Sequence, residues 1–164
     1  MASPYSQKIA TVETTLGTFK LLFYPEKAPL HVENFVKLAE SGYYDGTTFH
    51  RIVPGFMIQG GDPEGTGMGG HSWKGPGQTL QAELSDMLHV AGTLSMARTN
   101  DPNSAGSQFF ICLGRQTFLD GQYTVFGQTI EGWEVVRRMG HLKTGEGDRP
   151  LQPVTITRVA LEDL

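Results

Sequence analysis

The sequence predicts a mainly β protein in which many short strands form an antiparallel barrel or sandwich. Its apolar stretches are mostly four to eight residues long, and glycine, proline, asparagine and aspartate separate them, which is typical of strands joined by turns. Two segments have the apolar spacing of a helix. Closing the sheet into a barrel would remove the exposed strand edges on which other chains can pair.

The chain begins with a predicted hairpin, followed by a helix. Residues 8–24 are rich in Val, Ile, Thr, Phe and Tyr, which favour strands, and Gly17 interrupts them as a turn would. Pro29 suits the first turn of a helix over residues 29–41, and Gly42 suits its end. The buried face of that helix is predicted from four apolar residues at helical spacing: Val32, Phe35, Val36 and Ala39.

The remaining chain alternates between predicted strands and loops. A second, shorter helix is expected over residues 133–139, between Gly132 and Gly140. The segment 60–77 holds eight glycines and is expected to be a long ordered loop within one domain spanning 1–164. The predicted strands are 49–53, 56–59, 93–97, 108–113, 125–130 and 154–161.

Composition excludes several classes of function. The 13 basic and 17 acidic residues give a net charge of -4, so no phosphate-binding surface for nucleic acid is expected. No stretch approaches about 18 consecutive apolar residues, so no membrane span is expected. The single cysteine, Cys112, lies in an apolar run and is expected to be a small buried hydrophobe. We therefore expect a monomer in the cytoplasm.

Three familiar motifs are absent or incomplete. Residues 65–70 have the G-x-G-x-x-G spacing, but the segment that follows cannot start the helix that a dinucleotide site requires. The five histidines lack the spacing of metal ligands. Ser107 lies outside a G-x-S-x-G elbow, so a hydroxyl that supports the backbone is expected there. No cofactor and no metal are predicted.

Two strands are predicted to present polar and apolar side chains together on an outward face. In residues 108–113 the alternate residues Phe109, Ile111 and Leu113 are all apolar and mark the core face. Gln108 and Phe110 should then point outward together. In residues 56–59, Met57 and Gln59 are paired in the same way.

Arg51 is a charge within the mostly apolar strand 49–53. The strand pattern alone leaves two interpretations open, a structural arginine that snorkels or forms an ion pair, and a functional one. Around it, residues 49–62 and 106–111 closely resemble the two signature segments of cyclophilins. Further runs are similar to the family in the same order: 34–38, 42–47, 94–97, 119–121 and 125–127.

The resemblance implies a fold, an activity and a site. The fold would be a closed eight-stranded antiparallel barrel capped by two α-helices, and the activity cis/trans isomerisation of the peptide bond before proline. The resemblance assigns catalysis to Arg51, Gln59 and Phe110, with Arg51 stabilising the twisted imide and Gln59 supporting it. Substrate binding falls to Phe56, Met57, Ala97, Arg98, Gln108, Phe118, Leu119 and Tyr123.

The sequence departs from the best-known members of the family at several positions. Phe118 stands where many have tryptophan and lacks the indole N–H that donates to cyclosporin, so weaker binding of that inhibitor is expected. Tyr123 replaces a common histidine, and Arg98 a frequent asparagine. Residues 73–77 look expanded near the expected position of the residues before the substrate proline.

The expected partners are proline-containing peptides and unfolded or folded client proteins, and cyclosporin with reduced affinity. One alternative is a module that binds proline motifs without turnover. It is less favoured because binding alone would not require a guanidinium beside the imide nitrogen. A second alternative, a hydrolase using Ser107 or His50, would need an activated nucleophile that the sequence does not indicate.

Overall fold

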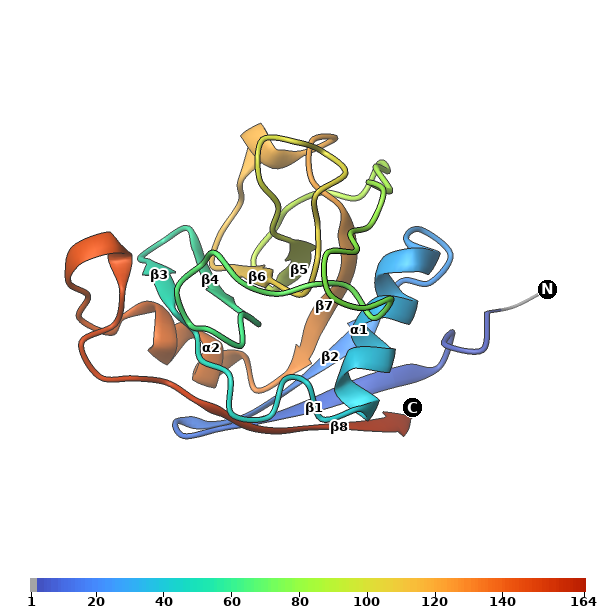
Figure 1. The fold of residues 1–164 in the computed structure, drawn as a ribbon. Helices are drawn as coiled ribbons and strands as arrows, with labels where there is room; N and C mark the ends of the chain where they lie inside the picture. The colour runs from blue at the N-terminus through green and yellow to red at the C-terminus, as the bar shows by residue number, and fades with distance from the viewer. Residues whose placement is uncertain (1–2) are drawn as a thin grey trace.

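The computed structural model describes residues 3–164, which form one eight-stranded antiparallel sheet with two α-helices (Figure 1). The order of the strands in the sheet is β3-β4-β6-β5-β7-β2-β1-β8. The strands are β1 (Lys8–Thr14), β2 (Gly17–Phe23), β3 (Arg51–Val53), β4 (Met57–Gly60), β5 (Thr93–Met96), β6 (Phe109–Cys112), β7 (Val125–Glu131) and β8 (Ile156–Asp163). The mainly β class predicted from the sequence is confirmed.

The predicted closure of the barrel is not complete. Strands β3 and β8 lie at the two ends of the order, and an isolated bridge between Thr48 and Thr155 links the segments next to them. The backbone N–H of Phe49 also donates to the carbonyl of Val154 at 3.0 Å. Because β3 has only three residues, and these contacts precede it, the sheet is a curled half-barrel held together at its seam.

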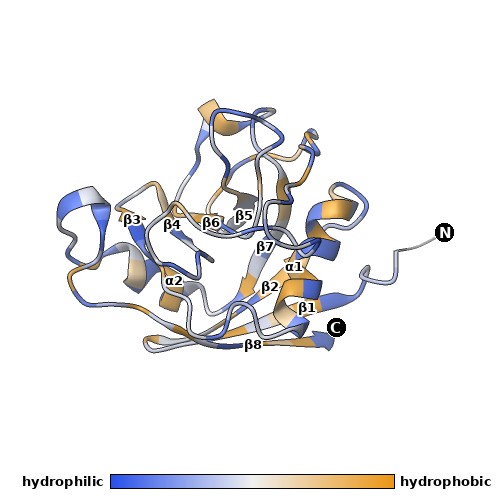
Figure 2. Ribbon diagram, in the orientation of Figure 1, coloured by the Kyte–Doolittle hydropathy of each residue, from blue (hydrophilic) through white to orange (hydrophobic). Residues whose placement is uncertain are grey.

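The two helices lie at opposite ends of the curled sheet (Figure 1). Helix α1 (Pro29–Glu40) begins with proline in its first turn, and Val32, Phe35 and Val36 on its inner face are buried, as predicted. The first N–H groups of a helix have no acceptor within it. Here the Glu83 carboxylate, far along the chain, accepts from the backbone N–H of His31 at 2.8 Å. Helix α2 (Trp133–Gly140) buries Val135, Val136 and Met139. Apolar and polar residues alternate along α1 (Figure 2).

Buried side chains form two separate apolar clusters. The larger is the interior of the half-barrel and includes Phe109 and Ile111 of β6. The smaller comprises Met57, Phe110, Cys112 and Leu119, with Val53, Phe56, Ala97 and Tyr123 packed against it. Alternate residues of β6 therefore lie on opposite sides of the sheet, as the two-residue period predicts. The smaller cluster is the floor of the site described below.

Within residues 3–164, no helix combines the length and apolar character needed to cross a lipid bilayer.

Candidate functional site

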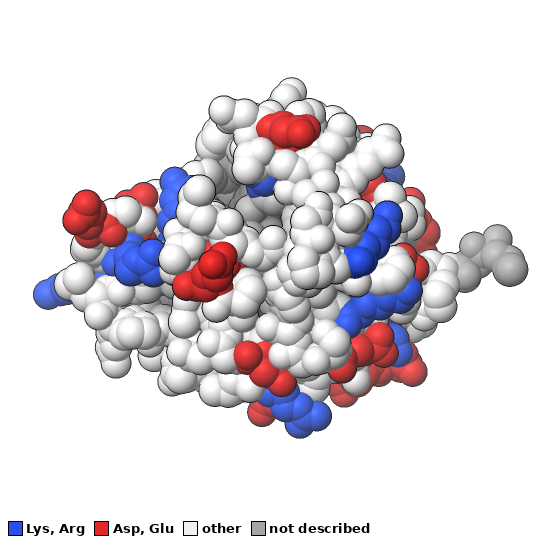
Figure 3. All heavy atoms as spheres, viewed as in Figure 1, with Lys and Arg blue, Asp and Glu red and all other residues white. Residues whose placement is uncertain are grey.

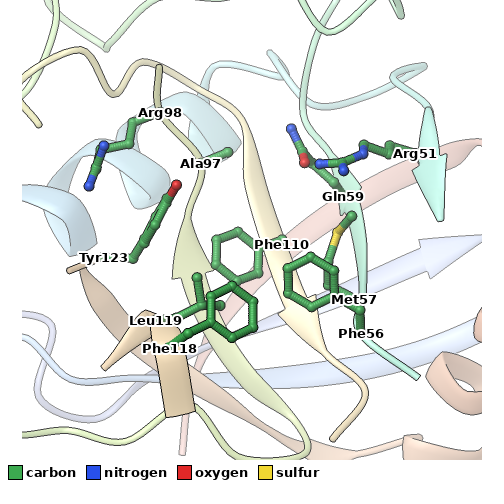
Figure 4. A pocket seen from close by; sticks show the side chains of 10 residues that line it. All are labelled: Arg51, Phe56, Met57, Gln59, Ala97, Arg98, Phe110, Phe118, Leu119 and Tyr123. Atoms are coloured by element: carbon green, nitrogen blue, oxygen red, sulfur yellow. The ribbon is translucent and has the colours of Figure 1, made fainter. Parts of the chain in front are cut away.

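A hollow with a volume of about 320 Å³ opens over the smaller apolar cluster. Of the site residues predicted from the sequence, ten surround it, and Gln108 is the exception (Figure 4). The lining residues are Arg51, Phe56, Met57, Gln59, Ala97, Arg98, Phe110, Phe118, Leu119 and Tyr123. The curl of the sheet brings them together from three strands and three connecting segments.

The floor of the hollow is apolar and closely packed. Met57, Phe110 and Leu119 are at most 5% exposed. Tyr123 stands edge-on to Phe110, with ring centroids 6.0 Å apart. Such a surface can take up a small apolar ring and shield it from water.

The outer lip of the hollow is formed by Phe118, which is 64% exposed. A short 3-10 turn, η1 (Thr117–Leu119), places Phe118 outward and Leu119 inward. The ring of Phe118 lies 5.6 Å from that of Phe56, which is the nearest aromatic support that it has. Phe118 therefore offers apolar surface to a ligand but no hydrogen-bond donor.

Arg51 enters the hollow from β3, where it is paired across the ladder with Gln59 of β4. Its side chain remains 45% exposed, and Nε lies 3.7 Å from Oδ2 of Asp148. Asp148 belongs to a second 3-10 turn, η2 (Glu146–Asp148), and has a φ of 59°. No sequence pattern predicts this contact, because 97 positions separate the two residues and Asp148 lies in a loop of no recognisable motif.

Gln59 and Gln108 hold the glycine-rich loop against the sheet. Gln59 Nε2 donates to Gln108 Oε1 at 3.0 Å, and Gln108 Nε2 donates to the carbonyls of Gly67 and Gly69 at 3.0 and 2.9 Å. Gln108 therefore lines a second, adjoining hollow of about 220 Å³. Gln59 is expected to support Arg51, but within residues 3–164 the two side chains form no hydrogen bond, because the amide of Gln59 is turned toward Gln108.

A buried polar network under the floor was missed by the sequence reasoning. His89 Nε2 lies 2.8 Å from Ser95 Oγ, and His89 Nδ1 lies 3.2 Å from Asp120 Oδ1. The imidazole is parallel to the ring of Phe110, at 6.1 Å. Burial lowers the pKa of His89, although Asp120 opposes this, and a hydrogen bond from Arg115 lowers the pKa of Asp120. Only the fold brings these residues together.

The other candidate nucleophiles are structural. Ser107 Oγ donates to the Gly61 carbonyl at 2.7 Å and accepts from Tyr43, so it supports the backbone as predicted. Cys112 is fully buried, and burial, together with the charge of Asp120, raises the pKa of its thiol to about 12. His50 is 5% exposed, and within residues 3–164 neither of its ring nitrogens has a hydrogen-bond partner. A hydrolase built on Ser107 or His50 therefore lacks its activated nucleophile.

The hollow thus joins a guanidinium and a carboxamide to an open apolar floor on the outer face of a curled antiparallel sheet. Its lining, as far as the structure describes it, includes no serine, cysteine or carboxylate. A lining of this kind can take up a small apolar group of a ligand, with the guanidinium and the carboxamide beside it as hydrogen-bond donors.

Comparison with known proteins identifies the family. The model of the family described as "Cyclophilin type peptidyl-prolyl cis-trans isomerase/CLD" matches residues 9–161. The chain belongs to this family, and it is a peptidyl-prolyl cis-trans isomerase.

Relatives and solved structures cover nearly the whole chain. The Arabidopsis thaliana peptidyl-prolyl cis-trans isomerase CYP18-1 is 48% identical over 92% of this chain and 94% of its own length. A peptidyl-prolyl cis-trans isomerase-like 1 of Neurospora crassa is 50% identical over 90% of each chain. A Cryptosporidium parvum cyclophilin, solved in the presence of the dipeptide Ala-Pro, matches with a TM-score of 0.90 and 33% identity over 95% of this chain and 99% of its own.

Proposed function

We propose that this protein accelerates rotation about X-Pro bonds by stabilising the twisted imide with Arg51, and that it assists the folding of client proteins in the cytoplasm. Rotation is slow because it breaks amide resonance, against a barrier of about 18–20 kcal/mol. As the bond twists, lone-pair density returns to the proline nitrogen. A guanidinium aimed at that nitrogen stabilises the twisted state more than either planar state.

The observation that carries this proposal is the position of Arg51 at the rim of the apolar floor. Its half-exposed side chain lines the same hollow as Phe56 and Phe110, so a proline ring on the floor would lie next to the guanidinium. The Ala-Pro dipeptide named with the Cryptosporidium structure supports the same class of ligand for this chain. Proline-containing peptides, free or within client proteins, are therefore the proposed substrates.

One hydrogen bond does not supply the whole effect. A rate gain of about 10⁴ requires roughly 5.5 kcal/mol, whereas a charge-assisted hydrogen bond contributes about 1.5–3 kcal/mol. The balance is assigned to the floor, where Met57, Phe110 and Leu119 would hold the proline ring still and remove water from the amide. Gln59, on the neighbouring strand, would position the peptide.

Exchange NMR on an Ala-Pro peptide tests this proposal. The wild type should broaden the cis and trans signals, and Arg51→Ala should lose most of the exchange while still binding the peptide. Because Arg51 is half exposed, the variant should fold, which thermal unfolding checks. Equal line shapes with and without the wild type would instead favour a module that only binds proline motifs. Full exchange in Arg51→Ala would remove Arg51 from the mechanism.

A further inference from the structure

The hollow over the smaller apolar cluster, which is the proposed proline site, continues past Arg51 and Phe110 into the second, adjoining hollow. The two share three lining residues, Gln59, Ala97 and Arg98, so Arg98 stands at their junction. An extended peptide rises by about 3.3 Å per residue. The Arg98 guanidinium lies against the Tyr123 ring, which in turn packs on Phe110 of the floor, so a chain that leaves the floor toward the second hollow passes Arg98 within about two residues.

The charge along this groove is of one sign. Among the described residues that line either hollow, the charged ones are Arg51 and Arg98, although the chain as a whole carries a net charge of -4. The two arginines lie on opposite sides of Phe110 (Figure 4). In the space-filling view a hollow opens between the upper loops, and the charged atoms visible inside it are blue (Figure 3).

The two arginines differ in how their charge is balanced. Arg51 has the Asp148 carboxylate at 3.7 Å. Arg98 has no carboxylate within 4.0 Å in the part of the chain that the structure describes, and its charge is met only by dipoles and a ring. Its Nη1 and Nη2 each donate to a backbone carbonyl, of Thr99 and Gln122, at 2.8 Å.

Arg98 is also held in place. Its guanidinium carbon lies 4.2 Å from the centre of the Tyr123 ring, and the two carbonyl bonds tie it to loops on either side. Each Nη nitrogen carries two hydrogens and uses one on a carbonyl, so one on each is left for a ligand. A prepositioned cation of this kind loses little side-chain entropy when it binds an anion.

We propose that Arg98 makes this enzyme select X-Pro segments that carry an Asp or Glu carboxylate within two residues of the proline. This inference rests on the proposed function, since it concerns the substrates of the same site. An exposed ion pair contributes about 0.2–1 kcal/mol, which corresponds to a preference of up to about fivefold. The preference should weaken as salt is added, because the groove is open to solvent.

The test compares kcat/KM for pairs of proline peptides that differ only by Glu or Gln, placed one or two residues before or after the proline. The wild type should favour the Glu peptide of at least one pair by about two- to fivefold. Arg98→Gln should bring that ratio close to one, and Arg98→Lys should keep part of it. Arg137→Gln, which removes an exposed cation of α2, is the control and should leave the ratio unchanged.

The outcomes separate this inference from the proposed function. If the wild type accelerates the Glu and Gln peptides of every pair equally, the inference is wrong and the isomerase proposal stands. If the preference persists in Arg98→Gln, its assignment to Arg98 is overturned. If the wild type accelerates neither peptide of any pair, the proposed function itself has failed.

Discussion

At the scale of single residues, the proposed mechanism depends on the shape of the Arg51 guanidinium as well as on its charge. Arg51→Lys keeps the charge but loses the planar fork, and the shorter ammonium cannot place a donor at the same point. We expect kcat/KM for an Ala-Pro peptide to fall about tenfold or more, the equivalent of one charge-assisted hydrogen bond. Arg137→Lys, at an exposed position of α2 that does not line the hollow, is the matched control. Turnover near that of the wild type in Arg51→Lys would contradict the mechanism.

Phe118 allows a second prediction, about an inhibitor. The ring is 64% exposed at the lip of the hollow and is supported by Phe56, so a larger indole has room there. Phe118→Trp would add one N–H donor, and a neutral hydrogen bond contributes about 0.5–1.5 kcal/mol. Titration calorimetry should show cyclosporin binding to the variant about two- to tenfold more tightly, while Phe118→Leu should not gain affinity. Nanomolar binding by the wild type would contradict the proposed weakness.

Sequence reasoning found the lining residues of the hollow, but not how they are held. Motif resemblance located Arg51 and Phe110 because both lie in short segments whose residue types carry the signal. It could not find Asp148 beside Arg51, or the network from His89 to Ser95, because their members come from separate loops and strands. Gln108 shows the intermediate case: its outward direction followed from strand periodicity, while its hydrogen-bond partners depended on the course of the glycine-rich loop.

At the scale of elements, glycines show where the chain is closely packed. Gly132 precedes α2 with a φ of 78°, and a Cβ there would lie 2.5 Å from the carbonyl oxygen of Thr18 and 2.6 Å from Cα of Phe19. Gly77 has the same φ of 78°, but a Cβ on it would meet nothing within 4 Å. The two positions therefore share the same φ and differ in steric contact.

This pair makes a controlled prediction about stability. Gly77→Ala should cost about 1–2 kcal/mol, the usual penalty for a left-handed alanine. Gly132→Ala should cost about 1–3 kcal/mol more, because the backbone of β2 must move away to make room. Urea unfolding followed by circular dichroism measures both. If both variants lose the same free energy of unfolding, the backbone of β2 moves away from residue 132 without a measurable energetic penalty.

The elements themselves were largely predictable, and their ends were not. The helix predicted over 29–41 is observed as Pro29–Glu40, and the hairpin over 8–24 as β1 and β2. The strand predicted over 49–53 is only Arg51–Val53, because Phe49 bonds instead to Val154 across the seam. A partner more than 100 positions away decided where this strand begins, and no local pattern carries that information.

At the scale of the whole molecule, closure of the barrel also depends on contacts between residues far apart in the sequence, and this is why the sequence alone predicts a closed barrel. Residue alternation and strand number predict a curled sheet, but closure depends on whether the first and last strands in the order overlap over several residues. In this chain β3 is short and β8 starts only at Ile156, so the two strands do not pair. The segments before them are joined by the bridge between Thr48 and Thr155 and by backbone hydrogen bonds such as that from Phe49 to Val154. The class of fold was therefore predictable from the sequence and the completeness of the barrel was not.

Two buried histidines give the whole molecule a predictable response to acid. Burial lowers the pKa of His89 and of His50 from the usual 6.5. The carboxylates of Asp120 and Asp62, respectively, oppose that shift without cancelling it. The unfolded chain then takes up protons near pH 6.5, where the folded chain does not, so proton uptake favours unfolding as the pH falls.

We therefore expect full stability above about pH 7 and a progressive loss between about pH 6.5 and 5. A further loss should follow below about pH 4.5, where the carboxylates of Asp62 and Asp120, whose pKa values are lowered in the fold, become protonated in the unfolded chain.

Thermal unfolding at pH 7.5 and 5 measures the first step. His50→Gln should reduce the difference in Tm between these two pH values, because it removes a group that is buried in its neutral form, whereas His141→Gln, at an exposed position, should not. An unchanged Tm of the wild type across this range would mean that both imidazoles are protonated within the fold as easily as outside it.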